Sequence, residues 1–165
     1  MNIKEKIETL LAEISPVLET LKDEWFIIGA SALILSDVTI SDTKDLDLLT
    51  SRRDAAYLKT AWKERILDHT PADSDLFRSN FARFHFTTLD LEVLGGFEVN
   101  KGGKWIPLTV QEHYRIDYPA FSIKIPSLSE QKRILVFFGR PKDLTRIKLI
   151  NQKIKGESIK LSSPL

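Results

Sequence analysis

The sequence predicts an α+β fold, a mixed β-sheet flanked by helices, with helices at the N- and C-terminal ends of the chain. Amphipathic helical patterns lie at both ends, and short segments typical of strands lie between them. The predicted elements follow in the order α-β-α-β-α-β-β, which favours a mixed sheet. No repeat, low-complexity tract or interdomain linker interrupts the 165 residues, so we expect one domain over residues 1–155 and a tail over 156–165.

The composition is typical of a folded protein with almost no net charge. Lys and Arg number 24 against 23 Asp and Glu, a net charge of +1 that gives no global footprint for nucleic acid or an anionic membrane. The absence of Cys excludes disulfides and thiolate metal sites and fits a reducing compartment. Charges interrupt the apolar residues of the N-terminus, unlike those of a signal peptide. We therefore expect a cytoplasmic protein without membrane attachment.

The first elements are predicted by their hydrophobic spacing. Apolar residues recur at three- and four-residue steps from Ile3 to Leu21, which indicates an amphipathic helix that Pro16 is expected to bend or split. The run Trp25–Ile28 is typical of a short buried strand. The sequence Gly29-Ala30-Ser31 ends this strand, and Ala32–Leu35 is expected to begin a short helix.

A loop, a second strand and a second long helix are expected next. Residues Asp37–Thr43 are rich in Ser, Thr and Asp, which favours a loop, and Asp45–Leu49 alternates as a strand does. The segment Asp54–Leu67 has helical spacing. Its inward face is predicted to carry Ala55, Leu58, Trp62 and Ile66.

The second half of the chain is predicted to complete the sheet and cover it. Phe81–Phe86 and Leu89–Leu94 alternate as adjacent strands joined at Thr87-Thr88, and Gly95-Gly96 is expected to end the second strand. The remaining elements are expected to be a hairpin of Phe97–Val99 and Trp105–Leu108, a strand at Phe121–Ile125, a helix at Glu130–Phe138 capped by Gly139, and a helix at Lys142–Lys153.

The segment KDLDLL contains two acidic residues in an otherwise apolar strand. Residues two apart in a strand point to one face, so Asp45 and Asp47 lie side by side, with Cα atoms about 6.6 Å apart, while Leu46 and Leu48 face the core. Convergent carboxylates can share divalent cations. For an isolated pair of this kind, an edge strand with its polar residues toward solvent is the simpler interpretation.

Two further features favour a site. Gly29 follows a buried strand and allows close backbone approach to a ligand, and Ser31 can add a hydroxyl donor for a phosphate. Asp90 and Glu92 also share one face of their predicted strand. A third carboxylate from a neighbouring strand completes the oxygen ligands that Mg²⁺ takes together with substrate phosphates. The sequence has no P-loop motif.

The segments IIGASALIL and TKDLDLL together resemble the signature of the nucleotidyltransferase superfamily: a hydrophobic strand, Gly-Gly or Gly-Ser, a spacer, then alternating hydrophobic and acidic residues. LDLEVLGG resembles the strand of the third carboxylate in small bacterial and archaeal members. KIPSLSEQKRILVFFGRPKDLTRIKLI resembles the segment that follows their sheet. This layout belongs to the DNA polymerase beta-like minimal nucleotidyltransferases and the lincosamide nucleotidyltransferases, and the resemblance covers the chain from about Trp25 to Ile150.

The resemblance implies an enzyme that binds an NTP with Mg²⁺ (or Mn²⁺) and transfers NMP to an acceptor hydroxyl. In this interpretation Asp45, Asp47 and Glu92 hold the ions, and Glu92 also takes the proton of the acceptor. Asp90 is then a neighbour of the site rather than a ligand. Incoming phosphate charge is neutralised mainly by the cations, because no P-loop lysine is present.

Several residues are expected to contact the triphosphate. Gly29, Ala30 and Ser31 form the phosphate turn, in which Ala30 replaces the second Gly of the usual pair. The resemblance places Lys142 within reach of the triphosphate, with a solvated helix start as the equal alternative. Arg78 is expected to contact the triphosphate or the acceptor. A solvated turn is the favoured interpretation of Arg83.

Other functions remain open at this point. The chain is alternatively a toxin–antitoxin component that modifies a protein or tRNA, or a catalytically weak nucleotide-binding module, as the Ala30 departure suggests. The acceptor is accordingly a small molecule, a protein or a tRNA. The short region after the sheet leaves room for a second subunit, in a homodimer, to complete the acceptor pocket. His69, His85 and His113 lack metal-ligand spacing, so structural or exposed roles are expected for them.

Overall fold

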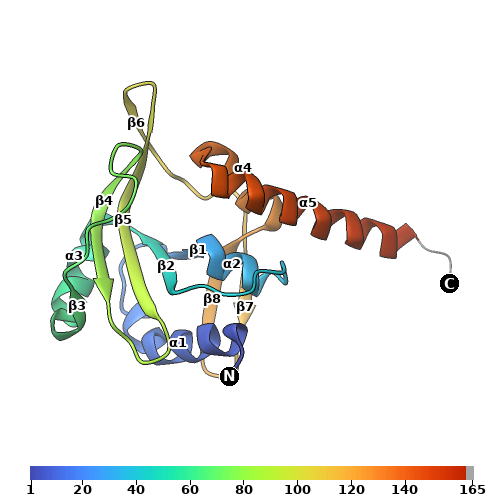
Figure 1. Ribbon diagram of the computed structural model, residues 1–165. Helices are drawn as coiled ribbons and strands as arrows, with labels where there is room; N and C mark the ends of the chain where they lie inside the picture. The colour runs from blue at the N-terminus through green and yellow to red at the C-terminus, as the bar shows by residue number, and fades with distance from the viewer. Residues whose placement is uncertain (163–165) are drawn as a thin grey trace.

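The order of the elements is shown in Figure 1, a computed structural model that describes residues 1–162, with side chains up to residue 159. The helices are α1 (Ile3–Leu18), α2 (Gly29–Leu35), α3 (Arg52–Ala61), the short 3-10 helix η1 (Lys63–Arg65), α4 (Leu128–Phe138) and α5 (Pro141–Ser162). The strands are β1 (Phe26–Ile28), β2 (Asp45–Thr50), β3 (Ile66–Leu67), β4 (Phe77–Phe84), β5 (Asp90–Lys101), β6 (Lys104–Pro107), β7 (His113–Asp117) and β8 (Ser122–Pro126).

The main sheet is mixed, as the sequence predicts. Its strands lie in the order β1-β2-β5-β4-β3, and β6 pairs with the far end of β5. Strands β2 and β5 are parallel, whereas the other pairs of this sheet are antiparallel. Strands β7 and β8 form a separate two-stranded sheet, of which the sequence analysis missed β7. A parallel pair requires a long crossover, and here the connection from β2 to β5 contains α3 and the β4 strand.

The two faces of the main sheet have different surroundings. On one face, Leu46 and Leu48 of β2 join Leu91 and Val93 of β5 in the largest hydrophobic cluster, which includes apolar residues of α1 and α3. The opposite face carries the acidic residues of β2 and β5, followed by a second cluster to which α4 contributes Ile134. The alternation of strand side chains therefore buries the leucines and leaves the carboxylates on the face toward α4 and α5.

The predicted end of the strand at Gly95-Gly96 is wrong. Strand β5 continues to Lys101, and the pairing with β4 shifts by one residue between Arg78 and Asn80, opposite these glycines. Gly96 has φ +59°, a conformation that a β-bulge needs and that a side chain disfavours. The bulge changes the alternation, so that Phe97 joins the apolar cluster on the acidic face.

The predicted helix Asp54–Leu67 is also corrected. Helix α3 ends at Ala61, and Ile66 lies in β3, where 44% of it is exposed instead of facing the core. Ile66 pairs with Phe84, and the backbone N–H of His85 donates to Arg65. Backbone pairing with the edge of β4 therefore replaces the last helical turn, although the apolar spacing continues.

Helix α1 is continuous through Pro16, so the expected split does not occur. Proline has no N–H for the carbonyl of Ala12, and the Ser15 hydroxyl donates to that carbonyl instead, at 3.3 Å. At the other end, Asn2 and Glu5 form a reciprocal capping box. The helix therefore keeps its apolar stripe up to Leu18, and the predicted continuation to Leu21 lies beyond its end.

The two C-terminal helices form as predicted, with one extension. Ser127 caps the start of α4, and Gly139 ends it in the left-handed conformation, with φ +70°. Helix α5 does not stop at Lys153 but continues to Ser162 and extends outward beyond the sheet (Figure 1). The tail predicted over 156–165 is therefore helical up to Ser162, and its last three residues lie outside the described part. Within residues 1–162, no helix has the length and apolarity needed to cross a membrane.

Candidate active site

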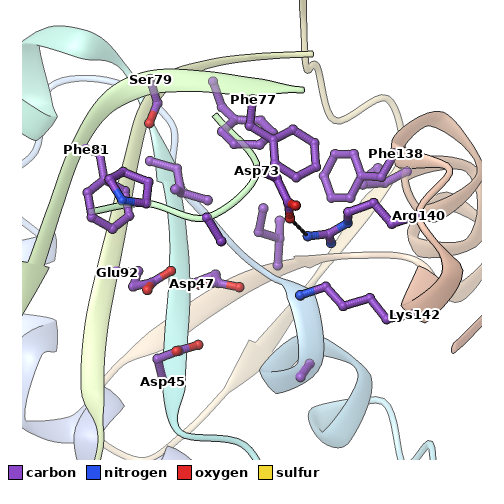
Figure 2. A pocket seen from close by; sticks show the side chains of 18 of the residues that line it. Asp45, Asp47, Asp73, Phe77, Ser79, Phe81, Glu92, Phe138, Arg140 and Lys142 are labelled. Atoms are coloured by element: carbon purple, nitrogen blue, oxygen red, sulfur yellow. Dashed lines mark hydrogen bonds and ion pairs between the residues drawn. The ribbon is translucent and has the colours of Figure 1, made fainter. Parts of the chain in front are cut away.

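The parallel pairing of β2 and β5 brings the predicted acidic residues together. Asp45 lies opposite Asp90, and Asp47 lies opposite Glu92. Oxygen atoms of Asp45, Asp47 and Glu92 all lie within 4.8 Å of one another, and the three residues are half-buried. Figure 2 shows their carboxylates gathered at the base of one pocket. Asp47 and Glu92, 45 residues apart in sequence (92 − 47), thus join one acidic cluster.

A cavity of about 490 Å³ lies above this cluster, between the acidic face of the sheet and the start of α5. Its polar end contains the three carboxylates with Lys142 and Arg146. Its apolar wall contains Phe77, Phe97 and Phe138. A concave site of this size, with few polar groups beside an apolar wall, is typical of small-molecule binding.

The Asp47 carboxylate lies in unfavourable electrostatic surroundings. Burial raises its pKa well above the ordinary carboxyl value, and the charges of Asp45 and Glu92 raise it further. The charge of Arg146 acts in the opposite direction and lowers this pKa. A carboxylate in such surroundings gains from a nearby cation, because the cation stabilises its ionised form.

Gly29 sets the shape of the turn beside Asp47. Its φ of +71° is in the left-handed region, and a Cβ placed on it would collide with the Oδ2 atom of Asp47 and lie 3.4 Å from Cγ. Both the backbone angle and the space therefore require glycine here. The predicted close approach of the backbone is made to a carboxylate of the chain itself.

Arg83 is a member of the site, and its interpretation as a solvated turn residue is wrong. It lies in β4 opposite Glu92, and only 13% of its side chain is exposed. One terminal nitrogen donates to Glu92 at 2.6 Å and to Asp45 at 3.1 Å. Its Nε and other terminal nitrogen donate to Asp90 at 3.1 and 3.0 Å. The predicted strand Phe81–Phe86 contains Arg83, but the sequence does not supply the register of β4 against β5 that places Arg83 opposite Glu92.

Comparison with known proteins identifies the fold. No family model and no curated protein sequence matches the chain. A candidate nucleotidyltransferase of Thermotoga maritima superposes with a TM-score of 0.72 at 19% identity, covering 91% of this chain and 96% of the other. This chain has the nucleotidyltransferase fold.

Two further nucleotidyltransferase structures superpose on the chain. The lincosamide antibiotic adenylyltransferase LnuA, solved with lincomycin bound, gives a TM-score of 0.57 at 14% identity, covering 92% of this chain and 98% of its own. An antigenic nucleotidyltransferase-like protein of Paracoccidioides brasiliensis gives 0.51 at 15% identity, covering 90% and 75%. The similarity therefore extends over nearly the whole chain.

In this nucleotidyltransferase fold, α5 supplies the positive side of the cavity. The Lys142 amine points into the cavity toward Asp47 (Figure 2). Arg146, one turn further along α5, also lines the cavity, and the sequence analysis missed it. The signal was present in the spacing, because residues four apart on a helix share a face.

Ser31 lies outside the cavity lining, whereas Arg78 lines the cavity and already has a partner. Ser31 is 1% exposed, and its hydroxyl donates to the backbone carbonyl of Asp45 at 3.2 Å, so it stabilises the start of β2 instead of lining the cavity. Arg78 lines the cavity, but its guanidinium donates to Glu98 at 3.0 Å and stacks on Trp105. Ala30, in contrast, lies on the cavity wall as expected, 7% exposed.

The aromatic wall is assembled from three distant segments. Phe77 lies 5.0 Å from Phe97 and 4.9 Å from Phe138, measured between ring centroids. The guanidinium of Arg140 stacks on Phe77 and Phe138 and is itself paired with Asp143 and Asp73. Its charge is therefore already neutralised, and this part of the cavity suits an apolar or planar group.

His69 is exposed, as one of its two expected roles allows, and it also borders the cavity. Its Nε2 lies 3.7 Å from the Oε1 atom of Glu92, and its ring is tilted over Phe81 with the centroids 6.0 Å apart. The pair lines the cavity beside the third carboxylate. No sequence spacing indicates this, because His69 comes from the loop before β4 and Glu92 from β5.

Proposed function

We propose that the protein is a metal-dependent nucleotidyltransferase that transfers NMP from an NTP to an acceptor hydroxyl. The supporting observation is the cluster of Asp45, Asp47 and Glu92 at the polar end of a cavity that Lys142 and Arg146 also line. The same cavity is thus bordered by carboxylates that can bind cations and by basic groups that can bind phosphates. The nucleotidyltransferase fold of the chain makes this chemistry the natural interpretation of the cluster.

The donor set fits Mg²⁺ or Mn²⁺. Asp45, Asp47 and Glu92 offer only oxygen ligands, which these cations prefer, and leave positions for water and phosphate. A bound divalent cation would neutralise the phosphate charge and polarise the reacting phosphorus. The charges of Asp45 and Glu92, which raise the pKa of Asp47, also favour a cation beside it.

The nucleotide is expected to lie with its triphosphate between the acidic cluster and α5. Lys142 and Arg146 then neutralise the β- and γ-phosphates with charge-assisted hydrogen bonds. Gly29 and Ala30 form the wall beside Asp47, where the absence of large side chains leaves room for the phosphates. Arg78 is left outside these contacts because Glu98 already binds its guanidinium.

Glu92 is the expected proton acceptor. The acceptor oxygen forms a bond to the α-phosphorus, the bond from that phosphorus to the bridging oxygen breaks, and pyrophosphate leaves. The hydroxyl proton moves to the Glu92 carboxylate, at the edge of the cluster beside His69 and Phe81. A hydroxyl held there lies on the side of the cluster away from α5, so that attack and departure occur from opposite sides.

The cavity favours a small acceptor with an apolar part. Phe77, Phe97 and Phe138 form a continuous aromatic surface that a ring or alkyl group can cover. A near-zero net charge offers little to a long nucleic acid, whose binding depends on basic surfaces. One structural neighbour, LnuA, was solved with the antibiotic lincomycin bound, which agrees with a small-molecule acceptor.

The test is a transfer assay with nucleotides labelled at the α-phosphate. The purified protein is incubated with each of the four labelled NTPs, Mg²⁺ or Mn²⁺, and separate pools of hydroxylated small molecules, tRNA and protein. We expect label in the small-molecule pool and release of pyrophosphate. Label confined to tRNA or protein would overturn the acceptor class, and absence of label from every pool would contradict the transferase.

Matched variants assign the reaction to the acidic cluster. Asp45→Asn and Asp47→Asn should each lower turnover by about three orders of magnitude, because each removes a charged ligand beside the reacting phosphate. Asp23→Asn serves as the control, since Asp23 is paired with Arg53 outside the cavity. Turnover that survives both cluster variants unchanged would exclude this site.

A further inference from the structure

Arg83 places a permanent positive charge within the acidic cluster. The nitrogen that contacts both Glu92 and Asp45 lies between two of the three carboxylates proposed as metal ligands. Within the described part of the chain, no hydrogen bond from Arg83 reaches Asp47. The guanidinium and a divalent ion therefore compete for the carboxylates of Asp45 and Glu92. The carboxylate of Asp47 is the ligand that remains available to the ion.

Asp90 provides the Arg83 guanidinium with a partner outside the proposed metal ligands. Its Oδ2 accepts hydrogen bonds from Nε and from the other terminal nitrogen of Arg83, at 3.1 and 3.0 Å. Its Oδ1 lies 3.1 Å from Nδ1 of His85, which orients the carboxylate from behind. Arg83 can thus release Glu92 and Asp45 and remain paired, without its charge becoming isolated.

The surroundings make this competition strong. Only 13% of the Arg83 side chain is exposed, and the carboxylates that it contacts are 19% to 27% exposed. Charges at such separations interact much more strongly in a partly desolvated site than in water. A divalent ion that approached Glu92 with the guanidinium still in place would be repelled by it at close range.

We propose that Arg83 is the resident cation of the acidic cluster, which a divalent ion must displace from Asp45 and Glu92 and which Asp90 then retains. Arg83 and Asp90 are therefore positioning residues that set how tightly the cluster holds its ion. The inference rests on the proposed function, because it takes the cluster to be a metal site. It adds a residue from β4 and a fourth carboxylate to that site.

The test measures Mn²⁺ binding to the protein without nucleotide, by electron paramagnetic resonance of the free ion. In Arg83→Gln the competing charge is gone, and the dissociation constant for Mn²⁺ should fall by at least about tenfold. In Arg83→Lys the charge remains but the bidentate geometry is lost, so an intermediate value is expected. Arg78→Gln removes a charge that borders the same cavity and pairs with Glu98, and should change the constant by less than about twofold.

Thermal unfolding provides a second readout that does not depend on activity. Without metal, Arg83→Gln should unfold at a lower temperature than the wild type, since three carboxylates lose their partner. Mn²⁺ should then raise the melting temperature of Arg83→Gln more than that of the wild type, because stabilisation grows with affinity. If Arg83→Gln does not fold without metal, Arg83→Lys is compared with Arg78→Gln instead, by the same Mn²⁺ affinities and melting temperatures.

The outcomes separate this inference from the proposed function. Mn²⁺ that binds Arg83→Gln as it binds the wild type, or more weakly, would overturn the role of Arg83 and leave the metal site in place. Mn²⁺ that binds neither protein would overturn both. Tighter binding in Arg83→Gln, with Arg83→Lys between the two, supports the displacement of a resident cation.

Discussion

Replacing Gly29 by Ala examines the turn on which the geometry of the acidic cluster depends. The φ of +71° costs an alanine about 1–2 kcal/mol in the left-handed region. The new Cβ would also collide with the Asp47 carboxylate, and forced overpacking typically costs about 1–3 kcal/mol. The two terms together predict a loss of about 2–5 kcal/mol in the free energy of unfolding.

A second glycine in the same backbone region supplies the control. Gly102 has φ +60° in the hairpin between β5 and β6, and a Cβ there would meet nothing within 4 Å. Gly102→Ala should therefore show only the backbone cost of about 1–2 kcal/mol. Urea unfolding of the metal-free proteins, followed by tryptophan fluorescence, measures both values under the same conditions.

The collision also predicts a functional effect that the control lacks. Displacing the Asp47 carboxylate should weaken Mn²⁺ binding in Gly29→Ala, whereas Gly102→Ala should bind Mn²⁺ as the wild type does. Equal unfolding free energies for the two variants, with Mn²⁺ binding unchanged in both, would refute the reasoning. Gly29 would then be required only for its backbone conformation and not for the space beside Asp47.

Four further substitutions test the electrostatics. Because the folded state holds the Asp47 proton more tightly than the unfolded chain does, stability falls as pH rises above the ordinary value of 3.8. Asp47→Asn should therefore raise the melting temperature of the metal-free protein at pH 8, with a gain that shrinks toward pH 4 in calorimetry; a lower melting temperature at pH 8 would contradict the burial argument. Lys142→Ala and Arg146→Ala should each raise the KM for NTP on the order of tenfold in steady-state assays, whereas Lys148→Ala, exposed on the same helix, should not. Asp143→Ala should cost about 2–3 kcal/mol in urea unfolding, since it removes a fully buried carboxylate and leaves Arg140 with Asp73 as its remaining acidic partner; a loss below about 1 kcal/mol would mean that the pair acts as a surface ion pair does.

The acidic pattern could be predicted from sequence because it is local. Side chains alternate along any strand, so Asp45 with Asp47, and Asp90 with Glu92, had to share a face within each strand. Which of these carboxylates would be neighbours depends on the register between β2 and β5, and only the structure supplies it. The prediction of one joint cluster therefore relied on the family resemblance for its third member.

Arg83 and the aromatic wall could not be predicted in the same way. Arg83 reaches the cluster because β4 pairs with β5 in one particular register. The wall forms because a bulge at Gly96 turns Phe97 toward the acidic face, where the sequence suggests only a strand end. From sequence alone, a glycine pair indicates the end of a strand. When the adjacent strand is known, the same pair can be recognised as a bulge within the strand.

By itself, the sequence determined the alternation of acids and leucines, the C-terminal cap of α4, the glycine at the start of α2 and the mixed order of helices and strands. These features depend on covalent geometry and on hydrogen bonds between residues a few positions apart. The tertiary structure decided which cations surround the carboxylates: Arg83 of β4 is hydrogen-bonded to them, and Lys142 and Arg146 of α5 line the same cavity. The partners of a charge are chosen when distant segments bury their apolar faces together, because only then do the remaining polar groups come within hydrogen-bonding distance.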